Sequence, residues 1–142
     1  MNLIGNLCRH SSYFYIKLKD SGILNQCIQL CEDQDKTVKK FACVVLGNAS
    51  FHDDSLYEAL RPTIPILINL IKDSEEKTRS NAAAALGNLA RNSQTLDIDF
   101  IKHGVNFQLI NLVLNEKSVS CKKVCVMAIM NLLSLPESRK LL

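Results

Sequence analysis

The sequence predicts an all-α fold in which short helical repeats stack into a right-handed solenoid. Its 142 residues are 47% hydrophobic, which is enough to build a core and too much for a disordered chain of net charge +3. An asparagine recurs at spacings of 42, 40 and 43 residues, at Asn6, Asn48, Asn88 and Asn131. No stretch shows the strict alternation of hydrophobic and polar residues that marks a half-buried strand.

The segments around these asparagines align without gaps. They read NLIGNLC (2–8), FACVVLGNAS (41–50), NAAAALGNLA (81–90) and VCVMAIMNLL (124–133). A leucine or isoleucine stands two residues before each asparagine, and a cation stands nine residues before the last three, at Lys39, Arg79 and Lys122. A period of about 40 residues in a helical chain is typical of armadillo and HEAT proteins. We therefore expect an armadillo/HEAT-type α-solenoid.

Each period predicts three helices. A short first helix is expected over 12–19, 55–60 and 96–103, before the breakers Ser21-Gly22, Arg61-Pro62 and His103-Gly104. A second, hydrophobic helix is expected over 23–31, 65–71 and 105–114. A long third helix begins near Thr37, Thr78 and Ser118 and carries the asparagine. Acidic residues precede each third helix, where they complement the positive end of the helix dipole.

These helices divide the whole chain into an array. We expect a partial repeat at 1–11, repeats at about 12–52, 53–92 and 93–135, and the start of a further repeat at 136–142. A solenoid that begins and ends within a repeat lacks the polar caps that shield its end faces. We therefore expect this chain to be a fragment of a longer protein.

The recurring asparagines predict a peptide-binding groove. In a solenoid of three-helix repeats the third helices lie side by side and line one concave surface, so Asn6, Asn48, Asn88 and Asn131 would form a ladder on it. A side-chain amide offers both a donor and an acceptor, and can hold the backbone of an extended peptide whatever its sequence. The alternative is that each amide bonds a neighbouring helix and only fixes the packing of the repeats.

Cations flank the ladder and indicate the charge of a partner. Lys40 and Lys123 stand eight residues before their asparagines, and Arg9 and Arg91 stand three residues after theirs. They predict a positive groove that favours acidic or phosphorylated segments, unless these cations are only scattered and solvated. The net charge of +3 is far below that of a typical nucleic-acid-binding protein, so no nucleic-acid partner is expected.

Neither catalysis nor metal binding is predicted. The six cysteines include no CxxC pair, and the pairs Cys27/Cys31 and Cys121/Cys125 belong to distant repeats, whereas a structural zinc site needs four converging ligands. Reduced, buried thiols are expected instead. No phosphate-binding loop and no catalytic triad occurs. An enzyme that uses a cysteine or a histidine is the alternative from another class, and no cofactor is expected.

No membrane span is predicted either. The longest hydrophobic run, 64–71, is interrupted by Pro65 and Asn69, and a span needs about 18 or more apolar residues. The first residues lack the basic start and apolar stretch of a secretory signal. We therefore expect a cytoplasmic protein.

The repeat motifs resemble those of known families. GNLCR (5–9), LGNAS (46–50) and LGNLARNS (86–93) resemble armadillo repeats, and this resemblance extends over essentially the whole chain. The stretch 41–93 resembles the C-terminal repeat region of Fused-type serine/threonine kinases. This resemblance implies a regulatory scaffold tail that follows a kinase domain. It also implies links to Hedgehog signalling and motile cilia in animals, and to cytokinesis with microtubule-motor partners in plants, hence association with the cilium or cytoskeleton.

The sequence departs from that pattern in two ways. Importin-type armadillo grooves place a Trp four residues before each Asn, whereas this chain has no Trp and holds Val44, Ala84 and Met127 there. Recognition of nuclear localisation signals in that manner is therefore not expected. Kinase motifs are also absent, so this segment would not itself phosphorylate proteins. The alternative within the same class is a stand-alone armadillo adaptor of the catenin or vacuole-anchoring kind, which also binds extended peptides.

Overall fold

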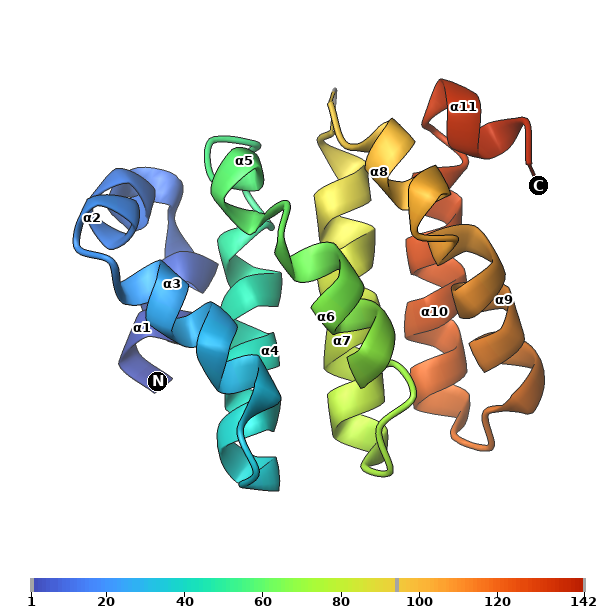
Figure 1. Ribbon diagram of the computed structural model, residues 1–142, viewed down its shortest axis with the longest axis horizontal. Helices are drawn as coiled ribbons and strands as arrows, with labels where there is room; N and C mark the ends of the chain where they lie inside the picture. Colours follow the sequence, from blue (N-terminus) through green and yellow to red (C-terminus); the bar gives the residue numbers. More distant parts are fainter. Residues whose placement is uncertain (1, 94, 142) are drawn as a thin grey trace.

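The computed structural model describes residues 2–93 and 95–141, and within these residues every regular element is helical (Figure 1). The all-α prediction is therefore confirmed. The chain opens with α1 (Asn2–His10) and closes with α11 (Pro136–Arg139). The first helices between them are η1 (Ser12–Phe14) with α2 (Tyr15–Asp20), α5 (Tyr57–Leu60) and α8 (Asp97–Lys102). The second helices are α3 (Ile23–Gln29) with η2 (Leu30–Glu32), α6 (Thr63–Leu70) and α9 (Val105–Asn115). The third helices are α4 (Lys36–Ala49), α7 (Glu76–Arg91) and α10 (Val119–Leu132).

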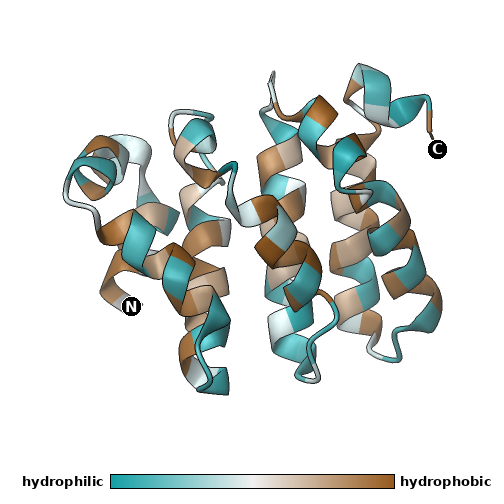
Figure 2. Ribbon diagram, viewed as in Figure 1, coloured by the Kyte–Doolittle hydropathy of each residue, from teal (hydrophilic) through white to brown (hydrophobic). Residues whose placement is uncertain are grey.

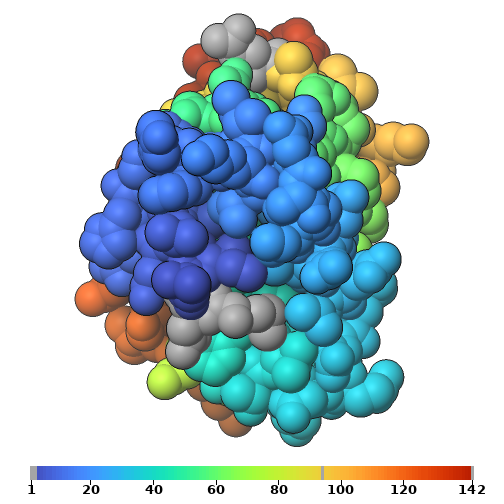
Figure 3. Space-filling view, turned by 90° about the vertical axis from the view of Figure 1, so that its left-hand side faces the viewer, coloured from blue at the N-terminus to red at the C-terminus, as the bar shows by residue number. Residues whose placement is uncertain are grey.

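The third helices form a continuous layer. α1 packs against α4, α4 against α7, and α7 against α10, while α3, α6 and α9 each pack on the third helix of their own repeat. Figure 3 looks at the N-terminal end of this stack, where α1, α2 and α3 (blue) face the viewer and α4 (cyan to teal) lies below them. We call the surface formed by α1, α4, α7 and α10 the third-helix face.

Hydrophobic burial explains why the helices stack in this way. Each helix carries both hydrophobic and hydrophilic positions (Figure 2), and the hydrophobic ones meet in a single core. The third helices contribute mostly small and medium side chains to it, including Ala42, Val45, Leu46, Ala82, Ala85, Leu86, Leu89, Ala128 and Leu132. Small residues at these positions allow the helix axes to approach. Among the described residues, no helix combines the length and the hydrophobicity that a membrane span needs.

Helix starts fall close to their predicted positions because capping residues fix them. Asp35 accepts hydrogen bonds from the backbone N–H groups of Thr37 and Val38, at 2.7 and 3.2 Å, and Ser118 caps α10 in the same manner. Three starts differ from prediction by two residues. α7 begins at Glu76, before the expected Thr78. α6 begins two residues earlier than the predicted Pro65, after Pro62 at φ −63°. α5 begins only at Tyr57, because the Asp53 carboxylate holds Ser55 in a turn.

Close contacts between third helices occur at glycines. A Cβ atom built on Gly47 would lie 3.7 Å from Cβ of Ala85, which is an ordinary contact. A Cβ atom on Gly87 would lie 2.8 Å from Cα of Ala128, closer than real Cβ atoms approach another residue. Glycine at position 87 is therefore needed for the packing of α7 on α10.

Two buried tyrosines connect consecutive repeats. The hydroxyl of Tyr15 donates to the carbonyl oxygen of Asn48 at 2.8 Å, and the hydroxyl of Tyr57 donates to that of Asn88 at 2.6 Å. The Tyr57 hydroxyl also lies 3.0 Å from the carbonyl oxygen of Ser50, and burial raises the pKa of this tyrosine to about 12. The Tyr15 hydroxyl likewise lies 3.5 Å from the carbonyl oxygen of Cys8, so each tyrosine contacts carbonyl groups near the ends of two successive helices of the third-helix face. These contacts fix the positions of Asn48 and Asn88 relative to the preceding repeat.

Candidate functional site

The asparagines form an inter-repeat ladder. The side-chain Nδ2 of Asn48 donates to the carbonyl oxygen of Gly5, that of Asn88 to Gly47, and that of Asn131 to Gly87, each at 2.9 Å. Every acceptor is the residue immediately before the asparagine of the preceding repeat. The packing role that the sequence left open is therefore present in the structure.

These bonds use only part of each amide. The side chains of Asn48, Asn88 and Asn131 are half-buried, and their Oδ1 atoms accept no hydrogen bond from the residues that the structure describes. An amide has two N–H groups and a carbonyl oxygen, so each of these three asparagines keeps an acceptor and a second donor for a ligand. Asn6 is exposed on α1, at the first position of the same row.

A hollow of about 260 Å³ lies between α7 and α10, next to two asparagines of the ladder. Asn88 and Asn131 line it, together with the hydrophobic side chains of Ala84, Val124 and Met127. Met127 is 66% exposed although it is hydrophobic, so this part of the third-helix face offers apolar surface beside free amide groups. The remaining residues around the hollow are Phe51, Gly87, Arg91 and Ala128.

The predicted groove cations differ in their surroundings. Arg91 stacks on the ring of Phe51, with its Cζ atom 4.3 Å from the ring centroid, and donates a hydrogen bond to the carbonyl oxygen of Phe51. Lys40 pairs with Glu75, with Nζ 3.3 Å from Oε1, so its charge is largely compensated within the protein. Arg9 and Lys123 are exposed. The cation next to the hollow is Arg91.

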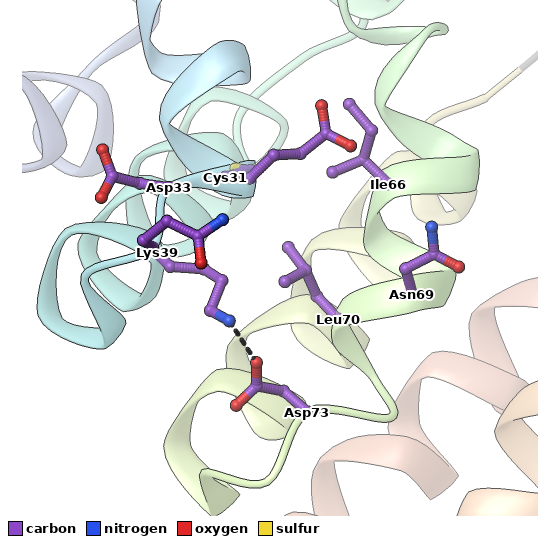
Figure 4. A pocket seen from close by; sticks show the side chains of 9 residues that line it. Cys31, Asp33, Lys39, Ile66, Asn69, Leu70 and Asp73 are labelled. Atoms are coloured by element: carbon purple, nitrogen blue, oxygen red, sulfur yellow. Dashed lines mark ion pairs between the residues drawn. The ribbon is translucent and has the colours of Figure 1, made fainter.

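A second hollow, of about 280 Å³, lies between η2 and α6 (Figure 4). The ion pair between Lys39 and Asp73, 2.6 Å long, closes one side of it. The same arrangement recurs one repeat later, where Arg79 pairs with Glu116 at 2.7 Å beside another hollow. The recurrence indicates a joint between repeats rather than a ligand site.

The sequence shows only one partner of each of these inter-repeat ion pairs. The cations nine residues before the asparagines were apparent, but their partners were not. The signal that could have found them is the 43-residue spacing of Asp73 and Glu116, which matches the repeat period. The hydrogen bond from Arg79 and the backbone N–H groups of Ser118 and Lys117 lower the pKa of Glu116 to about 2.

The cysteines lie in the core, as predicted. All six are buried and none forms a disulfide. Burial raises the pKa of Cys8 to about 11 and that of Cys121 to about 12. Because the thiolate is the reactive form, these cysteines are poor nucleophiles at neutral pH. Among the described residues, no group of three or more potential ligands is arranged to hold a metal ion.

Comparison with known proteins agrees with this geometry. The Armadillo/beta-catenin-like repeat family matches residues 62–91. A designed armadillo repeat protein, solved in complex with the peptide (KR)4, superposes with a TM-score of 0.90 at 22% identity, over 98% of this chain and 59% of that one. Computationally designed armadillo repeat proteins for modular peptide recognition superpose with a TM-score of 0.83 at 22% identity, over 90% of this chain and 54% of theirs. The chain is an armadillo-repeat region.

Its sequence is similar to parts of two named kinases. It is 47% identical to Serine/threonine-protein kinase TIO of Arabidopsis thaliana over 111 residues, which cover 78% of this chain and 8% of the kinase. It is 30% identical to Serine/threonine-protein kinase 36 of Mus musculus over 131 residues, which cover 92% of this chain and 10% of the kinase. The chain thus spans about a tenth of the length of these relatives. The resemblance to Fused-type kinases, seen in residues 41–93, extends over most of the chain.

Proposed function

We propose that this chain is a non-catalytic protein-interaction scaffold that binds an extended peptide on its third-helix face. The observation that carries the proposal is the ladder of asparagines, whose Oδ1 atoms and second N–H groups are free beside an apolar hollow. An extended peptide needs backbone partners at regular intervals, and equivalent amides on successive third helices supply them. A designed armadillo repeat protein of the same fold is in complex with a peptide, which supports peptide binding by this chain.

The size of the hollow also favours a peptide. Sites for small molecules and cofactors enclose about 300–1,000 Å³ and bury most of the ligand. The hollow between α7 and α10 measures about 260 Å³ and lies beside an exposed methionine. It is therefore suited to one side chain of a longer ligand rather than to a whole cofactor.

The similarity to kinases of much greater length supports a more specific role. We propose that this chain is part of the regulatory C-terminal region of a Fused-like serine/threonine kinase, where it recruits partner proteins. The cytoplasmic location, the cilium or cytoskeleton association and the involvement in Hedgehog signalling or cytokinesis belong to this proposal and rest on the resemblance alone. Sequencing the transcript upstream of Met1 tests it. An open reading frame with kinase motifs supports the kinase tail, and a true start codon supports a stand-alone adaptor.

Mutation of the third-helix face tests peptide binding. Peptides are selected from a random display library on the wild-type chain, and their affinities are then measured for two variants. Met127→Glu changes an exposed residue of the hollow, and Ile98→Glu changes one of similar exposure, 64%, on the first helix α8. We expect Met127→Glu to weaken binding about tenfold, or about 1.4 kcal/mol, and Ile98→Glu to leave it unchanged. Equal effects of the two variants would contradict the proposal.

A further inference from the structure

We infer that the hollow between α7 and α10 selects peptides in which a hydrophobic side chain stands close to an acidic one. This inference rests on the proposed peptide-binding function and specifies its ligand. The amides of Asn88 and Asn131 would hold the peptide backbone, the hydrophobic side chain would enter the hollow, and the carboxylate would reach Arg91.

The lining of the hollow favours a hydrophobic side chain over a cation. Ala84, Val124 and Met127 give it apolar walls, and none of the side chains that line it is acidic. An aromatic ring can bind a lysine or arginine through its face, but one face of the Phe51 ring already carries Arg91. A basic side chain in this hollow would therefore lose water without gaining an anionic partner, and it would stand close to the cation Arg91.

Arg91 is prepared to bind an anion. Its guanidinium is positioned by the Phe51 ring and by a hydrogen bond to the Phe51 carbonyl oxygen, while the residue as a whole is exposed. A guanidinium held in one orientation loses little conformational entropy when it binds a carboxylate, and its planar fork can form two hydrogen bonds to it.

Within α7 and α10 the charges are mainly positive, whereas Asp53 and Asp54, from the segment between α4 and α5, line a separate hollow together with Arg91. The helices α7 and α10 contain one acidic residue, Glu76, against the cations Lys77, Arg79, Arg91, Lys122 and Lys123. Glu76 accepts a hydrogen bond from the Ser118 hydroxyl at 3.0 Å and lies 15 residues before Arg91. At a rise of 1.5 Å per residue, about 22 Å of helix separates the two. That distance exceeds the screening length at physiological salt, about 8 Å, so Glu76 does not offset the charge of Arg91.

Four peptides of equal length test the inference on the intact chain. Each repeats one dipeptide four times, and the dipeptides are Leu-Glu, Leu-Lys, Ser-Glu and Ser-Lys, so hydrophobicity and charge vary independently. Dissociation constants are measured by fluorescence anisotropy. We expect the Leu-Glu peptide to bind about tenfold more tightly than either the Leu-Lys or the Ser-Glu peptide, because each of these lacks one of the two contacts.

A charge reversal provides the second arm of the test. Arg91→Glu is expected to reverse the order of the Leu-Glu and Leu-Lys peptides. Arg139→Glu, which makes the same change of net charge at an exposed position on α11, is expected to leave the order unchanged. Circular dichroism of both variants verifies that they fold.

The outcomes separate this inference from the proposed function. Equal affinities for the Leu-Glu and Leu-Lys peptides, tighter binding of the Leu-Lys peptide or no binding of any of the four would overturn the inference. In those cases the proposed function still holds if Met127→Glu weakens the display-selected peptides and Ile98→Glu does not. If neither variant weakens them, both the proposed function and the inference fail.

Discussion

Gly87 of α7 packs directly against the backbone of Ala128 in α10, so that a Cβ atom on the glycine would lie 2.8 Å from Cα of the alanine. The same row of residues places Gly47 against Ala85 with room for a methyl group. The two helix contacts look equivalent in sequence, since both glycines lie in an LGN motif. Only the contact at Gly87 excludes a side chain at the glycine position. Because the carbonyl oxygen of Gly87 also accepts the hydrogen bond from Nδ2 of Asn131, the backbone position of Gly87 matters for the site.

Gly87→Ala is therefore expected to destabilise the protein. The added methyl group meets backbone atoms of α10, which cannot move aside as a flexible side chain would, and overpacking of this kind costs about 1–3 kcal/mol. The better helix propensity of alanine recovers up to about 1 kcal/mol of that cost. Urea unfolding followed by circular dichroism measures the net change.

Gly47→Ala is the matched control. The new Cβ atom would make an ordinary contact with Ala85, so we expect the free energy of unfolding to rise by about 0.5–1 kcal/mol through helix propensity alone. Equal destabilisation by the two variants would show that the contacts at Gly47 and Gly87 do not differ in the space they leave for a Cβ atom, contrary to the structure.

The tyrosine contacts lead to a second prediction. Tyr57→Phe removes the hydroxyl that lies within hydrogen-bond distance of the carbonyl oxygens of Ser50 and Asn88. Both carbonyl groups then lack this donor in a buried environment. We expect a loss of about 1–3 kcal/mol in the free energy of unfolding. Tyr13→Phe serves as the control, because Tyr13 is 72% exposed and should have no measurable effect. Thermal melts of the two variants beside the wild type check the difference.

The fold could be read from the sequence because its signal is repeated. The asparagine and the hydrophobic residue two positions before it occur four times and the acidic loop three times, so a single ambiguous segment had little influence. Short first helices were less accurately placed. The Asp53 side chain, rather than helix propensity, decides where α5 begins, and turn contacts of this kind are weak signals.

The site was predicted only in part, because its details depend on how neighbouring repeats are rotated. An asparagine alone does not reveal whether its amide bonds a ligand or a helix, and here the close approach of the glycine carbonyls provides the helix partner. The pairing of Lys40 with Glu75 is equally invisible in a linear sequence, since 35 residues separate the two. The stacking of Arg91 on Phe51 of the preceding repeat is likewise invisible in the sequence, since 40 residues separate the two.

The ion pair between Arg79 and Glu116 predicts a dependence of stability on pH. The pKa of Glu116 lies at about 2 in the folded chain and at an ordinary value of 4.5 when unfolded, so folding favours the ionised carboxylate. Its contribution is complete above pH of about 4.5 and disappears as the pH falls through about 2. Unfolding midpoints measured from pH 7 to pH 2 should show this loss.

Glu116→Gln isolates the contribution of that carboxylate. We expect the variant to be less stable than the wild type by about 1–3 kcal/mol at pH 7, because a charge-assisted hydrogen bond is weakened. The difference should shrink toward zero near pH 2. Glu137→Gln, which affects an exposed pair with Lys140, should change stability little at either pH. A difference between wild type and Glu116→Gln that is independent of pH would contradict the assignment.

The last prediction separates the two roles of the ladder amides. Asn88→Ala removes the hydrogen bond to the Gly47 carbonyl oxygen and the free amide groups together, so both stability and peptide affinity should fall, stability by about 1 kcal/mol. Asn106→Ala removes a comparable bond, from Nδ2 to the Ser138 carbonyl oxygen at 3.0 Å, at a buried position on the second helix α9. We expect Asn106→Ala to lower stability but to leave the affinity for the display-selected peptides unchanged. Affinities are compared at a temperature where both variants are fully folded. If both lose affinity equally, the amide of Asn88 acts only through packing, and the peptide is held by other groups.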